Sequence, residues 1–152
     1  MVRNEMVRKV PVIKTSYAPE KVRYGDVLRI YIEAEDPDGD MLRIASVADQ
    51  VGYGRYPTDW IYLKPQYQQH FRGYLQWNSF SSSTSHMSEW TQVTLKVSVF
   101  DKAGSESNVV VFPFQFVSEA VPESQPPPPF SGGDPRLGCL NVNLLEPSLM
   151  GG

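Results

Sequence analysis

The densest group of side chains able to do chemistry lies in the run 34–40, Ala-Glu-Asp-Pro-Asp-Gly-Asp. Carboxylate oxygens are the ligands that calcium prefers in proteins. The spacing is not that of an EF-hand. Counted from Asp36, the first aspartate of the loop, Gly39 is the fourth residue, whereas an EF-hand has its glycine at the sixth position. Together with Asp101, which is expected at the same end of the fold, Asp36, Asp38 and Asp40 form a candidate calcium site. In the alternative interpretation, Asp-Gly makes a tight turn and the aspartates accept hydrogen bonds from nearby backbone N–H groups.

Aromatic side chains form a second group, concentrated between residues 53 and 90. Exposed tyrosine and tryptophan offer a large contact area at a small entropic cost, which suits a protein or carbohydrate surface. Alternatively, the tryptophans fill the core of the domain. We expect a mixture, in which Trp77 is buried and the loop 52–57, with Tyr53 and Tyr56, is exposed and binds a partner.

The sequence offers no arrangement of side chains that indicates catalysis. His70 and His86 lie in polar, loop-like contexts, and no helix presents them at metal-ligand spacing. There is no Gly-x-Ser-x-Gly elbow and no glycine loop of the kind that cradles phosphate. A glycosidase-like pair of carboxylates needs a cleft, which a small domain rarely offers. We therefore expect a protein that is not an enzyme and has no catalytic residues.

Composition and charge narrow the classes of partner. The chain of 152 residues has a net charge of −3, and its basic residues are scattered apart from Arg3, Arg8 and Lys9, so we expect no nucleic-acid binding. No stretch is long and apolar enough to cross a bilayer, and residues 1–10 lack the apolar core of a signal peptide, so no membrane insertion is expected. The single cysteine, Cys139, excludes an intramolecular disulfide and leaves the cellular compartment open.

Alternation of apolar and polar residues predicts seven β-strands. It is clearest in 27–35, where Leu28, Ile30, Ile32 and Ala34 face one side, and a slip of one residue would bury charges. Pro113 cannot donate to a strand ladder, so the last strand should be an edge strand or carry a bulge there. The predicted strands are 11–17, 27–35, 41–47 with Leu42 and Ile44 as its inward pair, 60–64, 73–78, 93–99 and 110–116, with a helical turn at 66–71.

These strands carry a family resemblance. The matching pieces are Pro-Val-Ile at 11–13, Gly-Asp-Val-Leu at 25–28, the run 34–42, Gly-Tyr-Leu-Gln-Trp at 73–77, and the run 97–105 leading into 112–116. In this order they resemble the cadherin-like and immunoglobulin-like repeats of bacterial surface proteins. The resemblance covers roughly residues 10–118, after an N-terminal segment 1–9. It implies a single immunoglobulin-like (cadherin-like) antiparallel β-sandwich of about seven strands, a fold that hosts many binding and spacer roles.

The C-terminal part, residues 119–152, has a different character. Its prolines, at 122 and 126–129, favour an extended polyproline II conformation. A short strand is expected at 139–145, where Leu140, Val142 and Leu144 alternate with polar residues. An isolated strand is not stable alone, so this one either docks on its own sandwich or adds to the sheet of a neighbour. We expect a Pro-rich extended arm whose three apolar residues bind a partner.

Two functional hypotheses follow. In the first, the chain is a non-enzymatic structural protein whose immunoglobulin-like domain and C-terminal arm make contacts with further copies or neighbouring subunits. Such a protein belongs to a large particle or filament, for example as a phage virion decoration or tail component. In the second, it is an adhesive module of a bacterial surface protein that binds protein or carbohydrate and is stabilised by calcium. No other cofactor is expected, and the location is either the particle or the extracellular surface.

Overall fold

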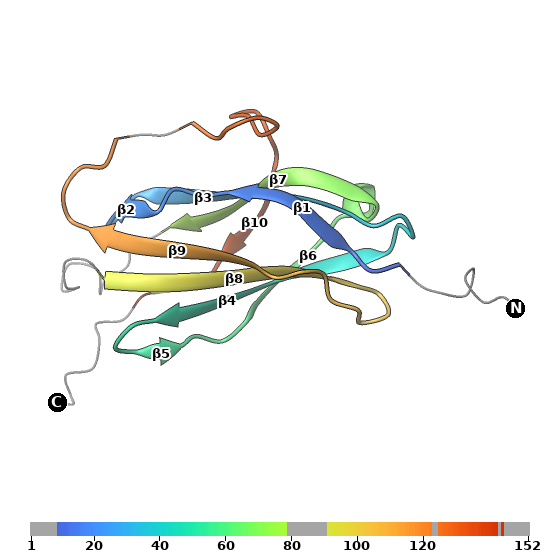
Figure 1. The fold of residues 1–152 in the computed structure, drawn as a ribbon, viewed down its shortest axis with the longest axis horizontal. Helices are drawn as coiled ribbons and strands as arrows, with labels where there is room; N and C mark the ends of the chain where they lie inside the picture. The colour runs from blue at the N-terminus through green and yellow to red at the C-terminus, as the bar shows by residue number, and fades with distance from the viewer. Residues whose placement is uncertain (1–8, 79–90, 123–124, 143, 145–152) are drawn as a thin grey trace, which may run out of the picture.

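The computed structural model consists of two β-sheets that face each other (Figure 1). It describes residues 9–78, 91–122, 125–142 and 144. Within these ranges the only helical element is the 3₁₀ turn Pro65–Tyr67, so the helical turn expected at 66–71 is shorter than predicted and begins one residue earlier. The fold is an all-β sandwich of the immunoglobulin-like kind, as the alternation and the resemblance implied.

The first sheet has four strands in the order β1-β3-β7-β10. β1 pairs with β3 and β3 with β7 in antiparallel fashion, whereas β10 runs parallel to β7 at the sheet edge. The bounds are β1 Val12–Tyr17, β3 Val27–Glu35, β7 His70–Asn78 and β10 Arg136–Leu140.

The second sheet follows the order β2-β9-β8-β4-β5, and β6 also pairs with β4. All of its pairings are antiparallel except that of β2 with β9. The bounds are β2 Lys21–Arg23, β4 Met41–Gln50, β5 Gly54–Arg55, β6 Asp59–Tyr62, β8 Thr91–Asp101 and β9 Val110–Val117.

The core lies between the sheets and contains the inward residues of the predicted strands. In β3 the four predicted inward residues are each at most 3% exposed, which confirms the register. Trp77 is fully buried, as predicted, and its ring packs edge-on against Phe114 and Phe116 of the opposite sheet. Contacts of this kind across the interior hold the two layers together.

The prediction for β4 was wrong at its start. A register shift between Met41 and Arg43 places Met41 in the core and leaves Leu42 half-buried, so the inward pair is Met41 and Ile44 rather than Leu42 and Ile44. A bulge inserts an extra residue and reverses the alternation that the sequence pattern assumes. The strands β2 and β5 were not predicted, because three and two residues are too few to show alternation.

Pro113 lies where the prediction placed it, at an open edge. β2 pairs with β9 only at residues 115–117, so in the described part of the chain Pro113 faces a strand on one side alone, opposite Thr94 of β8. The missing N–H group therefore costs no ladder hydrogen bond.

The boundary predicted between the domain and its arm is wrong, because the C-terminal segment belongs to the sandwich. After β9 the chain crosses the outer side of the first sheet and returns along β7 as β10 (Figure 1). The ring of Phe130 lies 5.5 Å from that of Tyr31, and Asp134 pairs with Arg72. The domain thus extends beyond residue 118 to include residues 136–142 and 144.

Candidate functional site

The acidic loop between β3 and β4 brings together three of the four predicted calcium ligands. One carboxylate oxygen from each of Asp36, Asp38 and Asp40 lies within 4.8 Å of the others. The loop is a tight turn in which the Gly39 N–H donates to the Asp36 carbonyl at 2.8 Å, and Gly39 takes a φ of 71° that favours glycine. The Asp36 N–H donates to the carbonyl of Gln69, which ties the loop to the end of the first sheet.

Asp36 is the unusual member of this loop because it is completely buried. Its Oδ1 accepts the N–H of Asp38 at 3.0 Å, but its Oδ2 is buried with no hydrogen-bond donor within reach. Burial raises the pKa of Asp36 to about 6, and the adjacent carboxyls of Asp40 and Asp38 contribute in the same direction. A cation placed among these oxygens would remove both the repulsion and the missing contact.

Asp101, the fourth predicted ligand, lies at the same end of the sandwich but does not join the cluster formed by the other three. The Lys102 N–H donates to the Asp40 carbonyl at 2.9 Å, which places the two turns side by side. Within its own turn, Asp101 Oδ1 accepts the N–H groups of Ala103 and Ser105 at 3.0 and 2.8 Å. Its role in this geometry is to hold the turn 101–105.

The two predicted partner-binding tyrosines, Tyr53 and Tyr56, differ in their exposure to solvent. Tyr53 is 42% exposed, as expected, whereas Tyr56 is 6% exposed and its hydroxyl donates to Gln50 within the buried interior. The two rings stack with their centroids 4.7 Å apart. The expectation that Tyr56 is exposed was therefore wrong, because a buried hydrogen-bond partner allows the tyrosine to enter the core.

A different aromatic surface forms on the outer side of the second sheet. Trp60 and Tyr62 point outward from β6 and are 40% and 62% exposed. The Arg43 guanidinium of β4 lies 3.8 Å from the Trp60 ring centroid and donates to the Tyr62 hydroxyl at 3.1 Å. Phe100 of β8 meets Trp60 edge-on at 5.4 Å. We call these four residues the aromatic–arginine cluster.

The sequence contained a signal for this cluster that was not used. Trp60 and Tyr62 alternate with Ile61 and Leu63, both of which are buried, so period-2 alternation already places the two aromatic residues outside. The predicted inward position of Ile44 likewise places its neighbour Arg43 outside, because the bulge between Met41 and Arg43 changes only the assignment of Met41 and Leu42.

Leu140, Val142 and Leu144 are 6%, 6% and 1% exposed and lie in the core of this chain. The Trp77 Nε1–H donates to the Val142 carbonyl at 2.9 Å, and the Asn141 N–H donates to Asp59 Oδ2 at 3.1 Å. Of the two alternatives for the C-terminal strand, the structure shows docking on its own sandwich. In this structure these residues, predicted to bind a partner, are core residues of their own chain. The observed strand spans 136–140, earlier than the predicted 139–145, of which residues 143 and 145 lie outside the described ranges.

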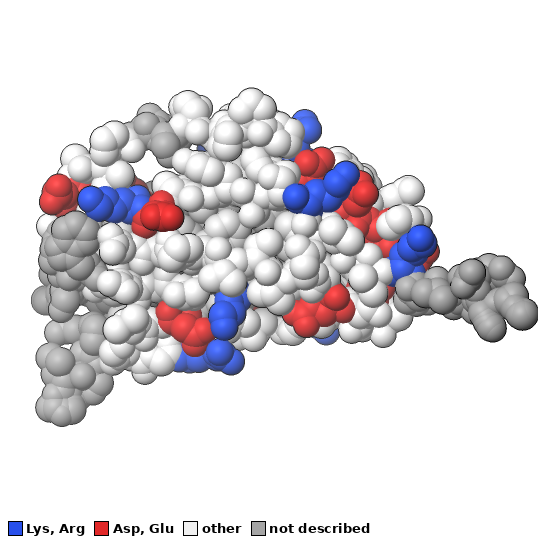
Figure 2. Space-filling view, viewed as in Figure 1, with Lys and Arg blue, Asp and Glu red and all other residues white. Residues whose placement is uncertain are grey.

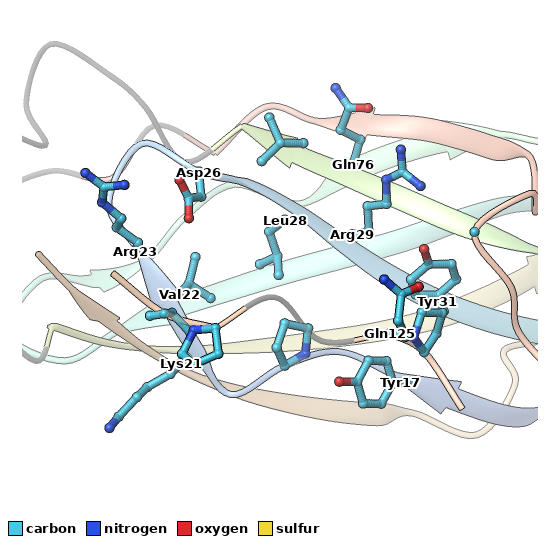
Figure 3. Close-up of a pocket in the computed structure, with 16 residues that line it drawn as sticks. Tyr17, Lys21, Val22, Arg23, Asp26, Leu28, Arg29, Tyr31, Gln76 and Gln125 are labelled. Atoms are coloured by element: carbon cyan, nitrogen blue, oxygen red, sulfur yellow. The ribbon is translucent and has the colours of Figure 1, made fainter. Parts of the chain in front are cut away.

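A cleft of about 780 Å³ lies between the first sheet and the segment that leads to β10. In Figure 3, Arg29 lies at the same end of the cleft as the tyrosines, whereas the other labelled charged residues lie at the opposite end. The Arg29 guanidinium lies 4.4 Å from the Tyr74 ring centroid, and a hydrogen bond with Tyr31 raises the pKa of Arg29. Because the charges are of both signs, the cleft favours no single class of ligand. Its labelled residues include Tyr17, Tyr31 and Gln125 at one end, and Lys21, Arg23 and Asp26 at the other.

The remaining titratable groups form small mixed sets. Figure 2 shows acidic and basic side chains dispersed in such sets over the face in view. His70 lies at the start of β7, where its Nε2 is 2.8 Å from Glu33 Oε2, rather than in the loop that was expected; His86 lies outside the described residues. No helix among the described residues has the length and apolarity needed to cross a membrane.

Comparison with known proteins finds a likeness to a solved structure. No protein-family model and no curated protein matches the sequence. The chain is similar to the CARDB domain of a Pyrococcus furiosus protein, whose crystal structure is described as a complex with di-metal ions. The TM-score is 0.43 and the identity 13%, over 74% of this chain and 96% of that one. The likeness concerns the β-sandwich, and the metal ions are those of the other domain.

Proposed function

We propose that this chain is a non-enzymatic assembly domain that binds further copies of itself through the aromatic–arginine cluster. The observation that supports the proposal is the exposure of Trp60 and Tyr62 next to Arg43 on an ordered sheet face. Tryptophan, tyrosine and arginine are the residue types that supply most of the binding energy at protein interfaces.

The arrangement of the cluster also favours binding. The hydrogen bond and ring contacts of Arg43 hold the side chains in place before a partner arrives, so less conformational entropy is lost on association. In the described part of the chain no carboxylate pairs with Arg43, which leaves its charge for a carboxylate of the partner.

The outer side of the second sheet continues beyond the cluster. Val47 of β4, Lys96 of β8 and Val111 of β9 lie in one cross-strand row on the outer side of the second sheet. Val111 is 54% exposed. An apolar centre with charged residues around it is the usual composition of a protein interface.

Sedimentation velocity of the full chain over a range of concentrations tests the proposal. The double variant Trp60→Ala, Tyr62→Ala is expected to weaken self-association by at least about tenfold, since each anchor contributes about 1–2 kcal/mol. The matched control is Tyr53→Ala, which removes a tyrosine outside the cluster that is about as exposed as Trp60, and it should leave association unchanged. Equal association of the double variant and the wild type, or a wild type that stays monomeric at millimolar concentration, would exclude this function.

A second candidate function, a calcium-stabilised module of a surface protein, is favoured by a different observation. The buried Asp36 Oδ2 has no hydrogen-bond donor and lies in a cluster with two further carboxylates. If calcium binds there, millimolar calcium raises the melting temperature and Asp38→Ala abolishes the rise. An unchanged melting temperature removes the calcium site from consideration.

A further inference from the structure

The C-terminal strand occupies a groove that fits its backbone closely. A Cβ atom added to Gly73 would lie 2.5 Å from the Pro135 carbonyl oxygen, and one added to Gly138 would lie 2.6 Å from Ile61 Cγ2. Both glycines thus allow an approach that a side chain would block. The groove between β6 and β7 is therefore shaped for residues 136–142 and Leu144.

The groove is also incomplete without this segment. If residues 136–144 left it, the Trp77 Nε1–H would lose its acceptor and β7 would become an open edge with Leu75 and Trp77 near solvent. An unpaired strand edge with exposed apolar side chains readily accepts a strand from another chain. The segment must therefore be supplied, but the contacts themselves do not require that it come from the same chain.

The connection to the groove is long enough to allow another donor. The segment 118–135 links β9 to β10, and its described contacts with the first sheet include Phe130 against Tyr31 and Asp134 against Arg72. Its prolines favour an extended conformation with about 3 Å per residue, so that once released it reaches roughly 50 Å. This is farther than the thickness of a two-layer sandwich.

We propose that two copies of this chain exchange residues 136–144, so that each completes the first sheet of the other. Every contact of the segment is the same within one chain and between two chains, and only the path of 118–135 differs. Under these conditions exchange has a low free-energy cost, and it increases with protein concentration. The inference deepens the proposed assembly function by identifying a second copy as the partner, and it uses residues distinct from the aromatic–arginine cluster.

The single cysteine provides a direct test, because Cys139 of β10 lies opposite Gln76 of β7. One chain keeps Cys139, and a second chain of different tag mass carries Gln76→Cys with Cys139→Ser. The two are unfolded, refolded together at high concentration, oxidised and separated on a non-reducing denaturing gel. A disulfide between the two chains at this pair forms readily only when the strand of one lies on the sheet of the other.

The control chain carries Gln92→Cys with Cys139→Ser, which places an exposed cysteine on β8, away from the groove. Exchange predicts at least about five times more mixed disulfide with Gln76→Cys than with this control. Mixed disulfide at the control level, while one chain carrying both Cys139 and Gln76→Cys closes an internal disulfide, would overturn the inference.

A second pair covers the case in which Gln76→Cys does not fold. The Asn141 N–H donates to Asp59, so Asn141→Cys in one chain and Asp59→Cys in the other, both with Cys139→Ser, report the same exchange. The outcome is separable from that of the proposed function. Failure of both cysteine pairs with continued loss of association in Trp60→Ala, Tyr62→Ala excludes exchange and leaves the cluster as the assembly surface.

Discussion

Two neighbouring turns at one end of the sandwich each bury an aspartate whose Oδ2 has no hydrogen-bond partner, yet the two carboxylates differ in their other contacts. Asp101, 2% exposed, accepts two backbone N–H groups through its Oδ1. Asp36, fully buried, accepts one through its Oδ1 and shares its loop with two further carboxylates. The Asp101 carboxylate thus has two backbone donors, whereas the Asp36 carboxylate has one donor and two further carboxylates beside it.

The difference shows that burial of an acidic residue does not by itself indicate a ligand site. A carboxylate that accepts backbone hydrogen bonds stabilises its own turn and has little need of a cation. A carboxylate crowded by like charges is destabilised in its ionised form, and a proton or a metal ion relieves that repulsion. On this argument only the loop of Asp36 is a candidate for cation binding.

The largest expected effect is a difference in how much the two aspartates contribute to the free energy of unfolding. Asp101→Ala leaves the N–H groups of Ala103 and Ser105 without their acceptor, and we expect it to lower the free energy of unfolding by about 2–4 kcal/mol. Asp36→Ala removes the hydrogen bond from the Asp38 N–H, but it also removes the repulsion between Asp36 and the neighbouring carboxylates. We therefore expect it to lower the free energy of unfolding at pH 7 by about 1 kcal/mol or less. Urea unfolding measures both values, and equal costs would contradict the comparison.

A smaller effect should appear in the pH dependence of stability. Because the pKa of Asp36 is raised to about 6 in the folded state, the folded chain retains a proton that the unfolded chain has already released. This contribution to stability is present at low pH and is lost as the pH rises from about 4 to about 6. The free energy of unfolding should fall by about 1–3 kcal/mol over this range, because each pKa unit corresponds to about 1.4 kcal/mol.

The matched variant for this measurement is Asp36→Asn, which keeps an Oδ1 acceptor for the Asp38 N–H but does not titrate. Urea unfolding of wild type and variant between pH 4 and 7 should show a loss of stability in the wild type that the variant lacks. Parallel profiles for the two proteins would show that Asp36 is not the titrating group.

Long alternating strands were predictable from the sequence because one face is buried along their whole length. The pattern in 27–35 determines both the bounds of β3 and its inward residues. Where the pattern is interrupted, the prediction failed for a physical reason. The bulge beside Met41 reverses the alternation, and β2 and β5 are too short to show one.

The candidate sites depended on contacts between residues far apart in the sequence, which the local pattern does not contain. The proximity of Asp36, Asp38 and Asp40 was predictable from their spacing within one turn. That Tyr56 is buried depends on its bond to Gln50, and the location of Leu140 depends on which sheet edge receives β10. Local alternation identifies that segment as a strand but not the sheet that it joins.

The smallest expected effect concerns which turn responds to calcium. At about 5 mM calcium we expect the melting temperature of the wild type to rise by about 3–6 °C, which corresponds to roughly 1–2 kcal/mol for a domain of this size. Asp101→Asn should keep this response, because its carboxylate lies outside the cluster of three, whereas Asp38→Asn should lose it. Glu20→Gln, at an exposed position on another loop, controls for the loss of one negative charge, and magnesium at the same concentration controls for ionic strength. A response that disappears in Asp101→Asn as well would mean that both turns hold the ion, and the contrast between the two carboxylates would then be one of geometry rather than of function.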